Sequence, residues 1–326
     1  MRRAITMEAG MPKIACVVVT YNRKKLLMEC LGAVLGQSVP VHTLVLIDNA
    51  STDGTRDALR QAGLLDDPRI IYRLMDKNTG GSGGFYEGIR MAREMDVDWL
   101  WVMDDDTIPG NTCLENLSRA QRLISASDRG NEKRPISFLA SAIYGPEGEY
   151  MNLPTLDAKP SGNGYAYWYQ FLQDGIVNIC DATFVSLLIS MAAVRKCGLP
   201  NRDYFIWGDD GEYTTRMTRF YGDAYFVGNS VAIHKRLNAK ALDIEHETDP
   251  KRIRMYKYLY RNNAINDRYY KKRNHVAAHC VRNILVSPLQ LRKKHGFDKM
   301  LALFQGNWEA LTKYSYFKKY IDDQIQ

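Results

Sequence analysis

The chain has 326 residues, of which 45% are hydrophobic and 25% charged, and its formal net charge is +7. This composition excludes a disordered or fibrous protein, and no uncharged apolar run of about 18 residues predicts a transmembrane helix. The six cysteines show no CxxC pair or disulfide-like spacing, so we expect reduced, mostly buried thiols in a cytoplasmic protein.

The first half of the chain alternates apolar, β-branched runs with amphipathic segments, a pattern typical of a parallel sheet covered by helices. We expect strands at 14–20, 43–48, 70–74 and 99–103, and helices at 24–36, 52–62 and 84–94. The strand at 14–20 (IACVVVT) has no polar face, so it should lie inside the sheet. The predicted fold class is therefore α/β.

The second half is organised differently. We expect a helix at 114–124, a Gly-, Pro- and Asn-rich loop at 144–165, strands at 184–190 and 224–233, and helices from 252 onward, divided by Pro288 and Gly296. Residues 1–12 lack the apolar segment of a secretory signal and are expected to form a loose leader. After this leader, the pattern predicts an α/β domain at 13–250 and a helical region at 251–326.

Three adjacent aspartates, Asp104, Asp105 and Asp106, follow the strand expected at 99–103. In parallel sheets ligands bind beyond the carboxyl ends of the strands, and a hard cation makes such a cluster tolerable. If the chain stays extended, Asp104 and Asp106 point the same way and Asp105 the opposite way. The cluster is a candidate metal site, with the start of a helix as the alternative.

Other polar motifs also follow predicted strands. Residues 20–23 (TYNR) end the first strand, and Asp48 ends the second, where it could bind a base or ribose or simply form a turn. The stretch 78–85 (NTGGSGGF) could let a ligand approach the backbone at a helix N-terminus, or could be a tight strand-to-helix turn. It has neither P-loop nor GxGxxG spacing.

Residues 205–213 (FIWGDDGEY) set two adjacent acids, Asp209 and Asp210, among glycines and aromatic residues. One carboxylate could accept a proton from a substrate hydroxyl, and an acidic helix start is the alternative. His234 ends an apolar run. By itself it would be an ordinary packed or surface histidine, but beside the aspartates it becomes a candidate metal ligand.

Taken in order and spacing, VVVTYNR, LIDNASTDGT, NTGGSGGF, WLWVMDDDT and WGDDGEY resemble the motifs of family 2 glycosyltransferases with the GT-A fold. The resemblance covers Ile14 to His234, and YRNNAI at 260–265 extends it. It implies a mostly parallel, Rossmann-like sheet flanked by helices. Within the family the chain looks most like the galactofuranosyltransferases, with rhamnosyltransferases as neighbours.

The resemblance implies inverting transfer of galactofuranose from UDP-galactofuranose, or alternatively of rhamnose from dTDP-rhamnose. The acceptor would be a bacterial surface glycan or a polyprenyl-diphosphate-linked glycan. Asp210 would be the catalytic base, and Asp104, Asp106 and His234 would hold Mn²⁺ or Mg²⁺. The implied donor site comprises Thr20, Tyr21, Asn22, Arg23, Asp48, Asn78, Gly81, Asp104 and Asp105. The implied acceptor site comprises Trp207, Asp209 and Glu212.

The basic charge is concentrated in the C-terminal region. Residues 251–326 contain 17 Lys and Arg against 5 Asp and Glu, a balance of +12. With its interleaved aromatic residues, this region could lie on an anionic membrane at the inner face of the cell membrane, or pack on the catalytic domain or a second subunit. We expect no nucleic-acid partner, because such a role would leave the acidic motifs unused. A nucleotidyltransferase would need a more basic early loop than residues 17–25 (VVVTYNRKK) provide.

Overall fold

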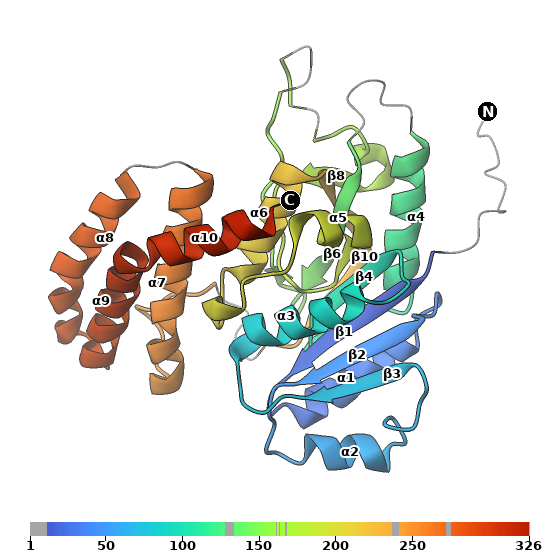
Figure 1. Ribbon diagram of the computed structural model, residues 1–326, viewed down its shortest axis with the longest axis horizontal. Helices are drawn as coiled ribbons and strands as arrows, with labels where there is room; N and C mark the ends of the chain where they lie inside the picture. The colour runs from blue at the N-terminus through green and yellow to red at the C-terminus, as the bar shows by residue number, and fades with distance from the viewer. Residues whose placement is uncertain are drawn as a thin grey trace.

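The computed structural model describes residues 12–127, 134–160, 162, 164–166, 168–236, 241–271 and 275–325. They form an α/β domain with a group of C-terminal helices beside it (Figure 1). The leader expected at 1–12 lies almost wholly outside the described residues. None of the described helices is long and apolar enough to cross a membrane.

The sheet has a parallel half and a mixed half. In the parallel half, β3 (Ile70–Leu74), β2 (Thr43–Asp48), β1 (Ile14–Thr20) and β4 (Trp99–Asp104) lie side by side in that order. The pairing of Thr20 with Asp48, and of Val19 with Asp104, brings the carboxyl ends of three strands to one edge. The four strands predicted here are confirmed, and they place the polar strand-end motifs together.

The mixed half continues from β4. Here β9 (Leu187–Ser190) runs antiparallel between β4 and β6 (Ile136–Tyr144), and β10 (Asp223–His234) lies parallel to β6. The short strands β5 (Thr107–Pro109), β7 (Tyr150–Met151) and β8 (Ile176–Ile179) pair antiparallel with β10, β6 and β10. The sequence pattern misses β6, whose buried serines interrupt its apolar run.

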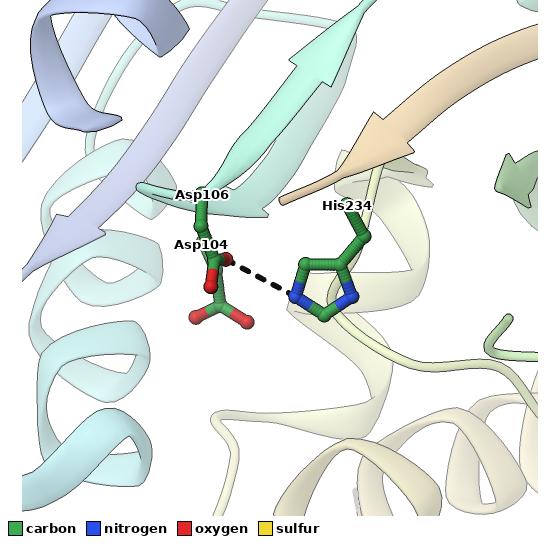
Figure 2. A group of neighbouring side chains, drawn as sticks. All are labelled: Asp104, Asp106 and His234. Carbon is green, nitrogen blue, oxygen red and sulfur yellow. Dashed lines mark ion pairs between the residues drawn. The ribbon is translucent and has the colours of Figure 1, made fainter. Parts of the chain in front are cut away.

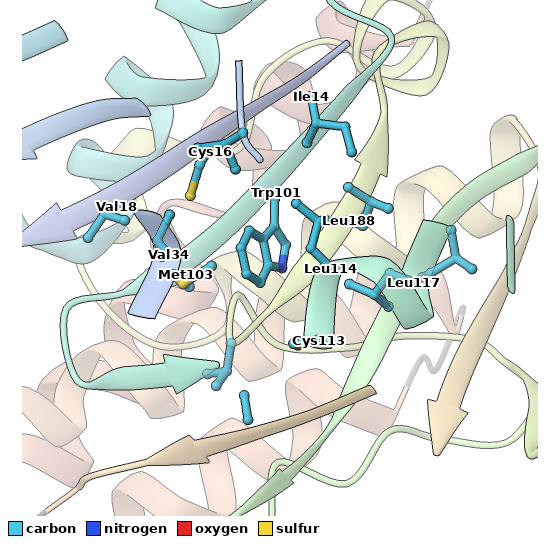
Figure 3. Close-up of a cluster of buried hydrophobic side chains, with 14 of the residues drawn as sticks. Ile14, Cys16, Val18, Val34, Trp101, Met103, Cys113, Leu114, Leu117 and Leu188 are labelled. Carbon is cyan, nitrogen blue, oxygen red and sulfur yellow. The ribbon is translucent and has the colours of Figure 1, made fainter. Parts of the chain in front are cut away.

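Helices cover both faces of the sheet. On one face, α1 (Lys24–Leu35), α2 (Thr55–Gln61) and α4 (Cys113–Ala126) pack against alternate residues of the strands. Figure 3 shows Trp101 among Val34, Met103 and Leu114 in this layer, where every one of these side chains is fully buried. On the other face lie α3 (Gly80–Arg93), α5 (Met191–Cys197) and α6 (Asp209–Phe220).

Helix α3 begins at Gly80, four residues before its predicted start at 84, so the glycines of NTGGSGGF lie in its first turns rather than in a loop before it. The glycines allow close packing. A Cβ at Gly84 would lie 2.4 Å from Val19 Cγ1, and one at Gly88 would lie 2.4 Å from Val17 Cγ1. These two glycines therefore bring the helix close to β1 and are explained without a ligand.

The C-terminal region is helical, as predicted. It contains α7 (Pro250–Tyr270), α8 (His275–Val286), the 3₁₀ helix η4 (Ser287–Arg292), α9 (Gly296–Thr312) and α10 (Tyr314–Gln324). Pro288 lies in η4 and Gly296 starts α9, so both divide the region as expected. Helix α10 returns to the α/β domain, where the Tyr320 hydroxyl donates to the Pro200 carbonyl at 2.9 Å (Figure 1).

Candidate active site

Three potential metal ligands converge at the carboxyl edge of the sheet. One ligand atom from each of Asp104, Asp106 and His234 can be chosen so that all lie within 4.8 Å of one another. Figure 2 shows the two carboxylates facing the imidazole, which projects from the end of β10. His234 Nε2 lies 3.1 Å from Asp106 Oδ1. Two oxygens and one nitrogen form a donor set suited to Mn²⁺ or Mg²⁺.

The aspartates converge for a different reason than strand alternation. β4 ends at Asp104, and Asp105 and Asp106 lie in a turn before β5. The prediction that Asp105 faces away from Asp106 is wrong, because Arg23 Nη1 contacts Asp105 Oδ1 at 3.3 Å and Asp106 Oδ2 at 2.5 Å. Arg23 thus partly neutralises the acidic cluster from the end of β1.

Burial dominates the electrostatics of the cluster. It raises the pKa of Asp104 well above its usual value, and the charges of Asp106 and Asp105 raise it further. Burial also raises the pKa of Asp105 to about 6, against the opposing effect of Arg23. For Asp106, burial raises the pKa, but His234, Arg23 and a backbone hydrogen bond together outweigh it and lower the pKa. A bound cation would favour the ionised form of all three carboxylates.

The predicted donor residues Thr20 and Asp48 are buried and engaged within the protein. The Thr20 hydroxyl donates to Asp105 Oδ2 at 2.7 Å, which ties β1 to the acidic turn. Asp48 Oδ2 accepts from the Tyr72 hydroxyl at 2.7 Å, and its Oδ1 accepts from the Ser51 amide at 2.8 Å. These contacts fix the strand ends that would line a nucleotide site.

The remaining predicted donor residues lie around this edge. Tyr21 is exposed at the end of β1, and Asn22 Oδ1 accepts from the Thr52 amide at 2.7 Å. Asn78 Oδ1 accepts from Asn49 Nδ2 at 3.1 Å, at the start of α3. At Gly81 a Cβ would meet nothing within 4 Å, so this glycine faces open space.

The acidic pair Asp209–Asp210 begins α6, where the helix N-terminus favours negative charge. Asp209 is buried and Asp210 is half-buried. Burial raises the pKa of Asp209 to about 7, with a further increase from Asp210. Burial also raises the pKa of Asp210 to about 6, and the Gly211 amide opposes that shift with a 2.7 Å hydrogen bond to Oδ1. The charge of Asp209 also acts on Asp104, which links α6 electrostatically to the metal site.

The other two predicted acceptor residues differ in their surroundings. Trp207 is half-buried, and its ring packs at 5.3 Å from that of Tyr256. Glu212 is fully buried and bonds Arg216 Nη2 at 2.5 Å and the Tyr270 hydroxyl at 2.5 Å. The prediction that Glu212 contacts an acceptor is therefore wrong, because this side chain has no exposed surface and joins α6 to α7.

Two residues that support the site were missed in the sequence. Asn152 Oδ1 lies 3.0 Å from His234 Nδ1 and can fix the imidazole with Nε2 toward the aspartates. Asn49 Oδ1 accepts from the Thr79 amide at 2.9 Å and so joins β2 to α3. The only sequence signal for Asn152 was its place in the Gly-, Pro- and Asn-rich loop predicted at 144–165.

The chain is similar to known proteins in sequence and in fold. Residues 15–122 match the family model of Glycosyl transferase family 2. The galactofuranosyltransferase GlfT1 of Mycolicibacterium smegmatis is 32% identical over 63% of this chain and 65% of its own length. The same enzyme of Mycobacterium tuberculosis is 34% identical over 63% of this chain and 64% of its own. The match thus spans slightly less than two thirds of each relative's length.

More distant proteins extend the comparison. The putative teichuronic acid biosynthesis glycosyltransferase TuaG of Bacillus subtilis is 29% identical over 28% of this chain and 38% of its own length. The solved structure of GalNAc-T7 with UDP, GalNAc and Mn²⁺ aligns with a TM-score of 0.55 at 14% identity, over 79% of this chain and 51% of that one. This last likeness shows a shared fold.

The fold is that of GT-A glycosyltransferases. The match of residues 15–122 to glycosyltransferase family 2 and the similarity to the two GlfT1 enzymes confirm the predicted resemblance to that family and to its galactofuranosyltransferases.

Proposed function

We propose that the protein is an inverting, metal-dependent glycosyltransferase that takes its sugar from a nucleotide-diphosphate donor. The observation that carries the proposal is the convergence of Asp104, Asp106 and His234 at the sheet edge where Thr20 and Asp48 also end their strands. This edge of an α/β sheet is the general position for a nucleotide ligand.

Asp104, Asp106 and His234 would hold the divalent cation. Their fit to Mn²⁺ or Mg²⁺ rests on the donor atoms, their spacing and the burial of carboxylates that repel one another. When bound there, a cation would neutralise charge on the diphosphate leaving group. Thr20, Tyr21, Asn22, Arg23, Asp48, Asn78, Gly81 and Asp105 would position the donor around it.

Asp210 would act as the base. The acceptor oxygen forms a bond to the anomeric carbon while the bond from that carbon to the diphosphate oxygen breaks, and the hydroxyl proton moves to Asp210. One such displacement inverts the anomeric configuration. A pKa of about 6 keeps Asp210 ionised at neutral pH yet basic enough to accept the proton. Asp209 and Trp207 would contact the acceptor.

Similarity to galactofuranosyltransferases supports UDP-galactofuranose as the donor. The acceptor would be a growing bacterial glycan, free or carried on a polyprenyl diphosphate. Titration calorimetry with UDP, dTDP and GDP, each with Mn²⁺ and with EDTA, tests the donor. Metal-dependent binding of UDP supports the proposal, dTDP preference favours rhamnose transfer, and binding of none of the three contradicts glycosyl transfer.

An anionic membrane surface would meet the protein at η4 and the adjoining ends of α8 and α9. Leu285 is 74% exposed and Phe297 is 65% exposed, with Leu289 and Leu291 exposed between them. The sequence from 281 to 297 contains no Asp or Glu, and its Arg282, Arg292, Lys293 and Lys294 are also exposed. Exposed apolar side chains beside basic ones suit the headgroup region of an anionic bilayer.

This surface lies near the chain segment that leaves the metal site. Glu245 follows His234 in the sequence. Its backbone carbonyl accepts a hydrogen bond from Lys299 Nζ at 2.7 Å, and its carboxylate pairs with Lys293 Nζ at 2.5 Å. Arg254 near the start of α7 pairs with Asp298 near the start of α9, and the charges of Arg252 and Asp106 both act on Arg236. A membrane bound at η4 would therefore lie toward the end of α7 nearest the metal site. That position suits an acceptor held in the membrane by its lipid, and a protein peripheral to the inner face of the cell membrane.

Co-sedimentation with phosphatidylglycerol and phosphatidylcholine vesicles tests the membrane surface. We expect binding to the anionic vesicles, weakened by salt and by the Leu285→Asp/Leu289→Asp double variant. Phe220→Asp changes an exposed apolar residue on α6, away from η4, and should leave binding intact. If all variants bind the vesicles equally, this surface does not bind lipid. If the double variant keeps vesicle binding but loses self-association, the surface is a contact between copies of the protein.

A further inference from the structure

The loop that leads into α6 has an unusual backbone. Phe205, Trp207 and Gly208 have positive φ angles of 67°, 60° and 88°, and helix α6 with its acidic pair begins at the next residue. Only glycine adopts such angles without steric cost, so the two aromatic residues hold strained conformations. Strained residues persist only where their surroundings hold them in place.

Helix α7 supplies most of the bonds that hold this loop. The side-chain amide of Asn262 is fully buried, and its Nδ2 lies 3.1, 3.1 and 2.7 Å from the carbonyl oxygens of Tyr204, Ile206 and Trp207. The two hydrogens of one side-chain amide are thus shared among three carbonyls of the strained segment.

Two neighbours of Asn262 on α7 bond the same loop. Arg261 Nη2 donates to the carbonyls of Asp203 and Tyr204 at 2.9 and 3.0 Å. Asn266 Nδ2 donates to the Gly208 carbonyl at 2.9 Å. The bonds from α7 therefore cover the loop up to the residue at which α6 begins.

The Phe205 carbonyl, in the same loop, is bonded by α3 and not by α7. The Phe205 oxygen accepts from the Ser82 amide at 3.1 Å, and a Cβ at Gly80 would lie 1.9 Å from it. The Phe205 ring stacks on Tyr258 of α7 at 4.8 Å. The loop is therefore fixed between α3, which adjoins the predicted donor site, and α7.

We propose that Asn262, with Arg261 and Asn266, is a positioning residue that sets where the start of α6 presents Asp210 relative to the sugar donor. The inference rests on the proposed function, in which Asp210 takes the acceptor proton. It makes the C-terminal helices part of the catalytic unit, because the residue that places the base belongs to α7. Donor binding, by contrast, depends on β1, β2 and β4, which Asn262 does not touch.

The test compares Asn262→Asp with Asn263→Asp. The first removes the amide donor and sets a carboxylate against three carbonyls, whereas the second makes the same chemical change on an exposed neighbour. We expect Asn262→Asp to lower kcat about 100-fold, because a displacement of about 1 Å can cost that much. The Kd for UDP with Mn²⁺ should stay within about twofold of the parent value. Asn263→Asp should match the parent protein.

Hydrogen exchange supplies a readout that does not depend on activity. Amides of residues 205–211 should exchange faster in Asn262→Asp and at the parent rate in Asn263→Asp. If Asn262→Asp fails to fold, Asn266→Asp serves instead. It removes the donor to Gly208 but keeps an acceptor for the Tyr204 hydroxyl, which lies 2.7 Å from Asn266 Oδ1.

Unchanged kcat, or a matching loss of kcat and of nucleotide affinity, would overturn the positioning role. Absence of transfer by the parent protein would instead reject the proposed function. In that case faster exchange confined to Asn262→Asp would still show that α7 holds the loop, and parent-like exchange would show that it does not.

Discussion

His234 Nε2 lies 3.1 Å from Asp106 Oδ1 because β10 pairs antiparallel with β5, in a register that sets His234 opposite Thr107. Thr107 follows Asp106 directly, so the strand pairing delivers the imidazole to the acidic turn. The Asn152 side chain then bonds the other ring nitrogen at 3.0 Å. Backbone pairing thus sets the position of the histidine, and a side chain sets its orientation.

Replacing His234 by Ala should weaken metal-dependent nucleotide binding by 10-fold or more, on the order of losses seen when metal sites are disturbed. Calorimetric titration of UDP in the presence of Mn²⁺ measures the effect. His246→Ala is the matched control, because that histidine is exposed and pairs with Asp243, away from the acidic cluster. Equal affinity in His234→Ala and the parent would remove this histidine from the ligand set.

Asn152→Ala should have a smaller effect of the same kind. It leaves all three potential ligands in place but frees the imidazole of His234 to rotate, so Mn²⁺-dependent UDP affinity should fall by roughly 10-fold. Asn152→Asp keeps an oxygen acceptor at the same position and should restore most of the affinity. A parent-like affinity for Asn152→Ala would mean that β10 alone orients the ring.

Replacing Asp210 by Asn should lower kcat by 10² or more while nucleotide affinity stays at the parent value, because a general base contributes on the order of 10²–10⁴. Asp209→Asn provides the comparison. Asp209 interacts with Asp104, so its replacement should alter metal-dependent donor binding as well as turnover. If Asp209→Asn shows the selective kcat loss and Asp210→Asn does not, the base is Asp209.

The pH dependence of turnover follows from the same residue. Burial raises the pKa of Asp210 to about 6, and the charge of Asp181 acts in the same direction. Only the ionised carboxylate accepts a proton, so kcat should fall below a pH of about 6 and level off above it. In Asp210→Asn, initial rates measured between pH 5 and about 8 should no longer show this fall at acidic pH. Persistence of the same fall in the variant would assign it to another group.

The acidic pair should also impose a stability cost that depends on pH. The pKa of Asp210 is raised on folding, so the native state favours the neutral form and loses stability as pH rises through about 6. Asp210→Asn should therefore raise Tm at pH 8 and have little effect at pH 4. Thermal unfolding at the two pH values measures the difference. A Tm gain that is the same at both pH values would exclude ionisation as its cause.

Local patterns were sufficient to predict the parallel half of the fold. β1, β2 and β4 are apolar runs that end in polar residues, and strand ends in a parallel sheet share one edge. β6 could not be recognised, because Ser137 and Ser141 find buried hydroxyl and carbonyl partners only in the folded sheet.

The grouping of Asp104 and Asp106 with His234 at one edge of the sheet was predicted for the same reason, and the role of Asp210 as the base stays a prediction. The contacts that hold these residues do not follow from motif order. Asn152 and Asn262 bond residues far away in the chain, and no local spacing marks them. Glu212 was misassigned because an acid beside Asp209 and Asp210 looks equally available in sequence. Only the packing of α6 shows that its side chain turns inward to Arg216.

The pair that Glu212 forms with Arg216 should be critical for stability. Both side chains have no exposed surface, and Arg216 Nη1 also donates to the carbonyls of Cys197 and Leu199 at 2.7 and 3.0 Å. Arg216→Met would leave the Glu212 carboxylate buried with the Tyr270 hydroxyl and without a cation. Breaking a buried pair in this way costs about 3–5 kcal/mol.

Urea unfolding followed by circular dichroism measures that cost. Arg60→Met is the control, because its pair with Asp57 is exposed on α2 and such pairs contribute about 0–1 kcal/mol. The double variant Glu212→Gln/Arg216→Met should recover part of the loss, since no unpaired charge remains buried. If Arg216→Met is no more destabilising than Arg60→Met, the buried pair does not hold α6 in place, and its position depends on α7 and the loop at 203–208.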